Sequence, residues 1–462
     1  MYRFPAGPQY PKKVIRMKKP RLVFVSLVAL TLTAIPVAVA VGARSSPSIS
    51  DLALLNGVIQ LVQRDYVHPI GPHELTKDAL KGMLNRLDPH SDYMDEQEFK
   101  ESQSNISGRF GGLGIEISEQ NGVPKVISPI DGTPAMRAGL QPGDLIVEID
   151  GQSSQGLSLD KVVHVLRGEP GTKVKLSILR GGKEPFEVTI TRSIIEVQTV
   201  KSKLEPNKVA YARVTEFGEN TAGDLEKALQ KMQSDAGGKL NGVVLDLRND
   251  PGGLLTAAVS IAGDFLKSGT VVTIKGRRSE DNQVYKVPTN GTIVPEAPMV
   301  VLINGASASA SEIVAGALQD RKRATIMGTQ SFGKGSVQTI IQLNGHGALR
   351  LTTALYYTPA GRSIQGQGIS PDVVVEAPKD QQIAGFLLPH ESSLRGAFRN
   401  PGQLNKPAAK SPAKEAAQAT KNSPPIKADL IGADNDAQLK EALAYLEKNK
   451  KVLEKPKSGS AG

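Results

Sequence analysis

Short apolar strands alternate with amphipathic helices between residues 197 and 376, and this alternation limits the possible folds more than any other feature of the chain. Strands are expected at 210–214, 242–247 and 299–303, and helices at 221–233 and 311–319. Two further strands, 337–343 and 349–357, flank Asn344-Gly345, a dipeptide typical of hairpin turns. The order of these elements predicts an α/β (α+β) domain built on a mixed sheet.

The chain before this domain divides into two segments. Residues 44–102 repeat apolar side chains at helical spacing, most clearly at 51–62 and 73–87. Residues 103–196 are dense in glycine and contain short runs typical of half-buried strands. These runs are 114–118, 124–128, 145–149, 174–179 and 186–190. The chain is therefore multidomain, with a helical region and a small β domain preceding the α/β domain.

The C-terminal residues predict a linker and a helix. Residues 377–433 include a stretch rich in Ala, Lys, Pro and Ser at about 401–428, which is too poor in apolar side chains to form a core. Residues 434–462 contain an amphipathic helix with Leu439, Leu443 and Leu446 on one face. We expect this helix to dock on the protein, and its docking site is left open.

Residues 1–43 predict a signal peptide or a membrane anchor. Seven basic residues and no acidic residue occur in 1–21, and Leu22 to Ala43 follow as 22 uncharged residues, long enough to span a bilayer. The basic flank stays inside, so residues 44–462 are exported in either case. The expected location is the periplasm, with an inner-membrane tether if the segment is retained.

Composition excludes several classes of protein. The formal net charge is +10, but the excess of basic residues lies at the two ends of the chain, so no basic patch is expected on the folded part and no nucleic acid is expected as a partner. The absence of Cys excludes disulfides, thiolate metal sites and cysteine nucleophiles. The six His show no metal-ligand spacing, so neither a metal nor a cofactor is expected.

The β domain resembles a PDZ domain. The run 109–115 places small residues before a strand, where main-chain N–H groups can converge on a carboxylate. The later run 138–151 is similar to the best-known PDZ signature. The resemblance implies that a peptide tail adds as a strand to a sheet edge, and Leu113, Gly114 and Ile115 are the predicted peptide-binding residues.

A serine-rich turn at 304–313 follows a predicted strand and begins a helix. A nucleophile at such a turn is exposed, and the helix N-terminus stabilises nearby negative charge. The chemistry alone leaves Ser307, Ser309 and Ser311 open as the nucleophile. A plain strand–helix turn capped by Ser311 is the alternative interpretation.

Lys334, between two glycines, is the candidate base for this serine. Burial disfavours the charged form of a lysine, and a neutral lysine could take the serine proton. Gln338, four residues on, could orient the lysine, although in a regular strand the two Cα atoms lie about 13 Å apart, so direct contact requires a bulge. Phosphate binding is the alternative role for Lys334, but the full Walker pattern is absent.

A Pro-Gly-Gly turn at 251–253 follows another predicted strand. The main-chain N–H of Gly253, together with that of Ala310 beside Ser309, could form an oxyanion hole. An ordinary Pro-Gly turn is the alternative.

These segments resemble the carboxy-terminal processing peptidases. The matching motifs are 87–93, 243–254, 307–320 and 331–338, in family order within residues 50–376, with the PDZ segment in its expected place. The resemblance implies a crotonase-like mixed-sheet core with Ser309 as the nucleophile, Lys334 as the base 25 residues later, and Gln338 as the third position. Asp250 replaces the more usual Asn.

The resemblance also implies the function and partners. We expect a serine endopeptidase that cleaves exported proteins near or from their C-termini, with apolar substrate tails received by the PDZ domain. Arg167, after the PDZ helix, is a candidate gating residue; a solvated charge at the end of a helix is the alternative. An adaptor or activator and a homo-oligomer are expected from the family.

Three other functions remain as alternatives. A catalytically inactive PDZ adaptor is opposed by the joint presence of Ser309, Lys334 and Gln338. Acyl-CoA chemistry on a crotonase-like fold would explain neither export nor the PDZ segment. A Ser-His-Asp hydrolase would need a suitable histidine, and His346 is the one to check.

Overall fold

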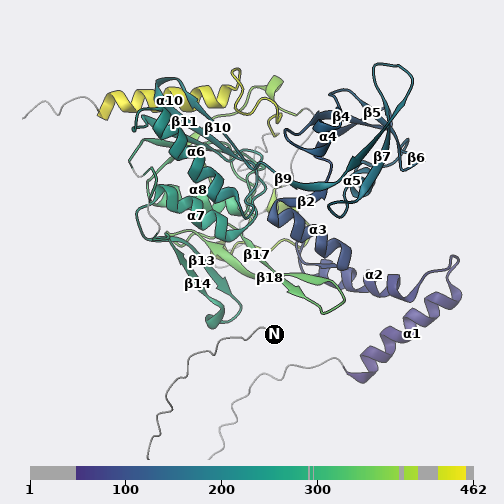
Figure 1. Ribbon diagram of the computed structural model, residues 1–462. Coiled ribbons are helices and arrows are strands. Elements are labelled where there is room, and N and C mark those ends of the chain that lie inside the picture. Colours follow the sequence, from purple (N-terminus) through teal and green to yellow (C-terminus); the bar gives the residue numbers. More distant parts are fainter. Residues whose placement is uncertain (1–47, 290–291, 295, 384–389, 404–424, 454–462) are drawn as a thin grey trace, which may run out of the picture. The chain divides into compact units, whose positions relative to one another are not determined.

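A computed structural model describes residues 48–289, 292–294, 296–383, 390–403 and 425–453 (Figure 1). The predicted export segment at 22–43 and most of the predicted linker at 401–428 lie outside these residues. No helix in the described ranges has the length and apolar character needed to cross a membrane. The chain forms two compact units, residues 1–67 and residues 68–462, and each unit is described by itself.

The first unit contributes one described helix, α1 (Ile49–Asp65). Its N-terminus is a capping box, in which Ser48 accepts from the N–H of Asp51 and the Asp51 carboxylate accepts from the N–H of Ser48. None of the side chains of α1 is buried.

The second unit begins with α2 (Pro72–Asn85), β1 (Asp92–Met94) and α3 (Glu96–Ser107). Pro72 starts α2, where its missing N–H costs nothing, and Asp95 caps α3. The chain passes from α2 into β1 within the 87–93 motif, because this short strand pairs with a partner more than 250 residues later in the chain.

The PDZ-like region is a mainly antiparallel sheet with the path β3-β4-β5-β7-β8, on which β3 is an edge strand. The elements are β3 (Ile115–Gln120), β4 (Val123–Pro129), α4 (Pro134–Arg137), β5 (Leu145–Ile149), β6 (Gln152–Ser153), α5 (Leu159–Leu166), β7 (Lys173–Leu179) and β8 (Phe186–Thr191). All five predicted strand runs form strands. A separate ribbon of β2 (Arg109–Gly112) and β9 (Ser193–Glu196) joins the two ends of this region. Of the expected anion-binding run 109–115, only Leu113 and Gly114 therefore lie outside a strand.

The core sheet has the path β10-β11-β12-β15-β16-β19, with β10 antiparallel and the other pairs parallel. Its strands are β10 (Val200–Glu205), β11 (Val209–Val214), β12 (Gly242–Asp246), β15 (Met299–Ile303), β16 (Thr325–Gly328) and β19 (Val373–Val374). One face packs on α6 (Thr221–Asp235), α7 (Leu255–Phe265) and α8 (Ala310–Asp320). The mixed sheet agrees with the fold class expected from the sequence, whereas α7 was not predicted.

A second sheet has the path β1-β18-β13-β14, with β17 paired to β18. Its further strands are β13 (Thr270–Gly276), β14 (Gln283–Lys286), β17 (Ser336–Gln342) and β18 (Ala348–Tyr357). The predicted 337–343 and 349–357 hairpin is β17–β18, and Asn344-Gly345 lies in its turn. The β13–β14 pair was not predicted.

The opposite face of the core sheet is covered by α10 (Ala437–Leu453). Leu439 and Leu446 are buried there, and Leu443 packs beside them. The helix α10 therefore docks on one face of β11, β12, β15 and β16, a site that the sequence left open. Every second side chain of these strands points to this face, Val244 and Val300 among them.

Candidate active site

Ser309 lies at the sharp turn between β15 and α8. Its backbone has φ 54° and ψ −109°, a conformation that a residue with a Cβ rarely adopts. Its N–H donates to the carboxylate of Glu312 at 2.8 Å, which fixes the turn from within the first turn of the helix. The structure therefore holds Ser309 in strained geometry at a helix N-terminus.

The other two candidate serines have structural hydrogen bonds. Ser307 is fully buried and its hydroxyl donates to the carbonyl of Leu247 at 2.7 Å. Ser311 is also fully buried and donates to the carbonyl of Asp250 at 3.1 Å. Both bonds tie the serine turn to the loop that follows β12, so these hydroxyls serve to join two loops.

The Pro-Gly-Gly turn lies directly against Ser309. Gly252 has φ 100°, and a Cβ added to it would lie 2.9 Å from both the Ser309 Cβ and the Ala310 N. The Gly252 N–H is used by the Asp250 carboxylate at 2.8 Å. Gly253 follows at φ 144°, and Ala310 is the first residue of α8, where N–H groups have no partner within the helix.

Lys334 lies in the loop before β17. Burial lowers the pKa of its ammonium; Arg350 acts in the same direction, while Glu391, Glu312 and Asp88 oppose the shift. No hydrogen bond joins the side chains of Ser309 and Lys334 in the part of the chain that the structure describes. The lowered pKa favours the neutral form that a general base requires.

Glu312 connects the serine turn to the lysine loop, and sequence reasoning missed this residue. Its carboxylate is fully buried and accepts from the N–H groups of Ser309 at 2.8 Å, Lys334 at 2.9 Å and Gly333 at 2.7 Å. The Ser331 hydroxyl donates to it as well, at 2.5 Å. Burial raises the pKa of Glu312 to about 7, although all four donors favour the ionised form. Its place three residues after Ser309, as in a capping box, was the available signal.

Gln338 follows a bulge in β17. The register of β17 against β18 shifts between Val337 and Gln338, as a Lys–Gln approach would require. The Gln338 amide donates to Ser336 Oγ at 2.9 Å and to Thr352 Oγ1 at 3.3 Å. Thr352 in turn donates to Asp88 at 3.0 Å, in the predicted 87–93 motif. Gln338 is thus fixed by its neighbours, and its role toward Lys334 stays a prediction.

Three family models match the chain. They are "Peptidase family S41" over residues 208–375, "PDZ domain" over 125–180 and "Activating protease CtpB N-terminal domain" over 37–98. A "Carboxy-terminal-processing protease" of Bartonella bacilliformis is 48% identical over 358 residues, covering 77% of this chain and 82% of that protein. The chain belongs to peptidase family S41.

Other relatives agree with this assignment. A CtpA-like serine protease of Staphylococcus aureus is 37% identical over 338 residues, covering 72% of this chain and 66% of the relative. Among solved structures, "Photosystem II D1 C-terminal processing protease" is 30% identical and covers 71% of this chain and 94% of that chain, with a TM-score of 0.43. The 48% identical relative and the PDZ family model show that the chain is a C-terminal processing serine protease with a PDZ domain.

In this peptidase the predicted peptide-binding residues lie at the start of the edge strand β3. Leu113 is buried, and its carbonyl accepts from Ala135. Gly114 has φ 76° and leaves no room for a Cβ, which would lie 2.3 Å from Thr133. Ile115 begins β3, whose other edge pairs with β4. The strand edge needed for peptide addition is therefore present.

Arg167 contacts the ribbon at the base of the PDZ domain. Its guanidinium stacks over the Phe110 ring at 4.3 Å and donates to Asn105 of α3 at 3.4 Å. These contacts place it at the connection between α3, β2 and the PDZ helix. Its gating role stays a prediction.

One alternative from the sequence, a Ser-His-Asp hydrolase, can be examined at His346. His346 lies at the β17–β18 turn, where its carbonyl accepts from Tyr93 at 2.8 Å. In the described ranges, no three His, Asp or Glu side chains gather closely enough to hold a metal ion.

Proposed function

We propose that the chain is an exported serine endopeptidase in which Ser309 and Lys334 form the catalytic dyad. One observation carries the proposal: the buried Glu312 carboxylate holds the main-chain N–H groups of both residues, at 2.8 Å and 2.9 Å. A single rigid acceptor thus fixes the two loops relative to each other. Such preorganisation is what a nucleophile and its base require.

The reaction follows from these positions. Lys334 Nζ in its neutral form takes the proton of Ser309 Oγ as this oxygen attacks the scissile carbonyl carbon. The N–H groups of Gly253 and Ala310 donate to the oxyanion. The protonated lysine then donates its proton to the leaving amine, the C–N bond breaks, and an acyl-enzyme remains. Water hydrolyses this ester by the same proton path and restores Ser309.

The PDZ domain is proposed to receive the substrate tail. The free edge of β3 offers main-chain groups to an extended peptide, and β2 followed by Leu113 and Gly114 precedes this edge. Substrates would therefore carry apolar C-terminal residues with a free carboxylate. An adaptor or activator could use the same domain.

The first experiment follows degradation of an unstructured protein with an apolar C-terminus by mass spectrometry. The wild-type chain is compared with Ser309→Ala, Lys334→Ala and Ser307→Ala. We expect a product ladder from the wild type and from Ser307→Ala, and none from the other two variants. Cleavage that persists in Ser309→Ala would mean that another residue is the nucleophile. A matching substrate with an amidated C-terminus should be cleaved more slowly if the tail carboxylate is recognised.

Export and self-association are further parts of the proposal. The uncharged segment at 22–43 after a basic run supports export, with the periplasm as the expected location and residues 22–43 as the membrane contact. Fractionation and alkaline extraction of cells would separate a cleaved from an anchored form.

A homo-oligomer is supported by the exposed apolar side chains on α1, and sedimentation of the purified chain tests it. These side chains are Ile49, Leu52, Leu54, Leu55, Val58 and Leu61.

A further inference from the structure

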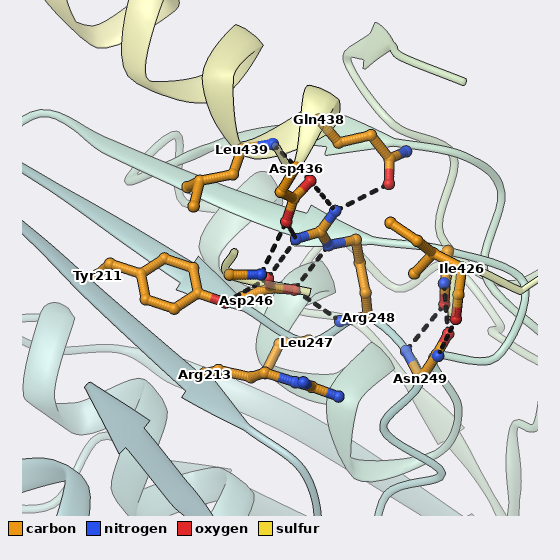
Figure 2. A network of polar contacts seen from close by, with 12 residues as sticks. Tyr211, Arg213, Asp246, Leu247, Arg248, Asn249, Ile426, Asp436, Gln438 and Leu439 are labelled. Carbon is orange, nitrogen blue, oxygen red and sulfur yellow. Dashed lines mark hydrogen bonds and ion pairs between the residues drawn. The ribbon is translucent and has the colours of Figure 1, made fainter. Parts of the chain in front are cut away.

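A buried arginine precedes the Pro-Gly-Gly turn and meets the C-terminal part of the chain. Arg248 follows β12, is fully buried, and donates to Asp246 through Nε at 2.9 Å and through Nη2 at 2.6 Å (Figure 2). Asp246 is the last residue of β12 and accepts a further bond from Tyr211 at 2.9 Å. This half of the network is local, because Asp246 and Arg248 are two residues apart.

The other half comes from 188 residues later in the chain. Asp436 accepts from Arg248 Nη1 at 3.0 Å and from Nη2 at 2.6 Å, and Gln438 accepts from Nη1 at 2.9 Å. The bidentate geometry fixes the guanidinium plane, which a single acceptor would not do. Figure 2 shows Arg248 reaching between Asp246 below and Asp436 above.

Asp436 is held in place by its own helix. It precedes α10, and its carboxylate accepts from the N–H of Leu439 at 3.1 Å, as an N-cap residue does. The N–H of Gly432 donates to it at 2.8 Å. Burial opposes its ionisation, but the bonds from Arg248 and these N–H groups outweigh this, so the pKa of Asp436 lies below its usual value. The ion pair is therefore intact at neutral pH.

A second bond joins the same two parts of the chain one residue further on. The Asn249 side chain donates to the carbonyl of Ile426 at 2.8 Å. Asn249 also exchanges two bonds with Asn304, at 3.0 Å and 2.7 Å, and Asn304 is the residue after β15 that begins the serine turn. The C-terminal segment 425–449 thus contacts the residues immediately before Asp250 and, through Asn249, the serine turn.

We propose that Asp436 is a positioning residue of the active site, which acts through Arg248 to hold the 249–253 loop where its N–H can meet the oxyanion. This inference rests on the proposed function. Asp436, immediately before α10, holds Arg248, and Arg248 is followed by the five residues of the 249–253 loop. This loop reaches the active site because Gly252 packs against Ser309. Asp436, immediately before α10, then supports the active site of the peptidase, whereas the apolar face of α10 covers the sheet.

The structure separates this role from simple support of the fold. If Asp436 loses its charge, Arg248 keeps Asp246 as a partner, so no unpaired charge is left in the core. Asn is as good an N-cap as Asp, so Asp436→Asn also retains the start of α10. By contrast, Leu446 packs against β12, where a Cβ on Gly242 would lie 3.1 Å from it, and it lies ten residues after Asp436, about 15 Å further along α10. Leu446→Ala therefore weakens docking of α10 without touching the arginine.

The test compares Asp436→Asn, Asp436→Ser and Leu446→Ala in the full chain. Ser also caps a helix but is too short to hold the guanidinium. We measure kcat and KM on an unstructured protein substrate, melting temperature, and hydrogen exchange of peptides that span 246–256. For both Asp436 variants we expect kcat to fall about tenfold or more with KM within about twofold, the size of a lost charge-assisted bond near an oxyanion donor. Exchange at 246–256 should be faster than in the wild type.

Leu446→Ala should lose melting temperature but keep kcat and slow exchange at 246–256. The proposal is overturned if both Asp436 variants keep kcat and slow exchange, or if Leu446→Ala loses both to the same extent. The exchange measurement needs no catalysis, so it decides the positioning role even if the wild type proves inactive. Inactivity of the wild type, or activity in Ser309→Ala, would instead contradict the proposed function.

Discussion

At the scale of single residues, the candidate site is distinguished by ionisable side chains that are buried. Ser309 lies in a strained turn, Lys334 has a lowered pKa, and Glu312 between them is a fully buried carboxyl. An amine and a carboxyl at these positions differ from surface groups because burial disfavours the charged form of each. Two predictions concern these residues.

Lys334→Arg should abolish activity while the protein stays folded. Arginine keeps the positive charge and much of the length of lysine, but its pKa above about 12 prevents it from accepting the serine proton. We expect kcat to fall by at least about a thousandfold, as for loss of a general base with its nucleophile. Peptidase assays and melting curves measure the two effects. Activity close to that of the wild type would show that Lys334 serves only as a fixed charge.

Glu312→Gln should lower kcat and change its pH dependence. In the wild type, protonation of Glu312 below about pH 7 removes an acceptor that the Ser309 and Lys334 N–H groups need, so kcat should rise as pH increases through that range. The neutral fraction of Lys334 rises in the same direction. The variant should lose at least about tenfold in kcat, because the Ser309 and Lys334 N–H groups share one carboxylate oxygen and both lose an acceptor if the amide nitrogen replaces it, and it should keep only the pH dependence of Lys334. Rates at pH values between about 5 and 9 measure both. Identical profiles for the two proteins would contradict this role of Glu312.

At the scale of elements, the site is made where strands end. The serine turn follows β15, the Pro-Gly-Gly turn follows β12, and these strands are parallel neighbours in the core sheet. The carboxyl ends of parallel neighbours lie at one edge, where ligands usually bind such sheets. Glycine at 252 allows the two turns to touch.

Gly252→Ala should separate these turns. The new Cβ would lie 2.7 Å from the Ala308 carbonyl oxygen and 2.9 Å from the Ser309 Cβ, so one turn must shift. We expect kcat to fall by about a hundredfold, the size of a lost oxyanion donor, with a small rise in KM. Gly345→Ala is the control, because it also has positive φ, at 72°, but open space around its Cβ. Equal loss of kcat in both variants would point to backbone strain in general.

At the scale of the whole molecule, the titration of a buried carboxyl makes the free energy of unfolding depend on pH. Asp264 lies in the last turn of α7, where a negative charge is unfavourable, and one of its oxygens has no partner among the described residues. Burial, with a smaller contribution from Glu226, raises the pKa of Asp264 to about 7. The folded protein therefore binds the Asp264 proton more tightly than the unfolded chain does. Protonated Asp264 favours the folded state at low pH, and the free energy of unfolding falls as pH rises from about 4 to about 7.

Asp264→Asn should therefore stabilise the protein above pH 7 more than at pH 5. The amide removes the cost of a buried charge, of the order of 1–3 kcal/mol. Thermal unfolding at about pH 5 and about pH 8 measures the difference. Asp235→Asn, at the exposed end of α6, is the control and should change stability equally at both pH values. A variant that is less stable than the wild type at pH 8 would contradict the prediction.

Much of the fold could be read along the chain because the relevant signals are local. Short apolar runs marked the five strands of the PDZ sheet path and β11, β12 and β15 of the core sheet, and Asn344-Gly345 marked the β17–β18 turn. The elements missed include α7, β10, β16, β19 and the β13–β14 pair, and they follow from tertiary context. Almost every side chain of α7 is buried, so the helix shows little amphipathic periodicity, and β14 is a short strand stabilised by pairing with β13.

The candidate site was only partly accessible from the sequence. Strand–turn–helix patterns indicated the serine turn, and the family resemblance selected Ser309 among three serines and paired it with Lys334. No local signal indicated that Glu312 would accept bonds from both loops, because its partners Gly333 and Lys334 lie more than 20 residues away.

By itself, the sequence determined the order of the segments, the periodicity of many elements and the candidate residues for the chemistry, because these depend on neighbours along the chain. Tertiary structure alone decided the sharing of Glu312 between two loops, the docking of α10 on the core sheet and the pairing of Arg248 with Asp436. Each of these joins residues far apart in the chain through burial, and burial is a property of the folded molecule.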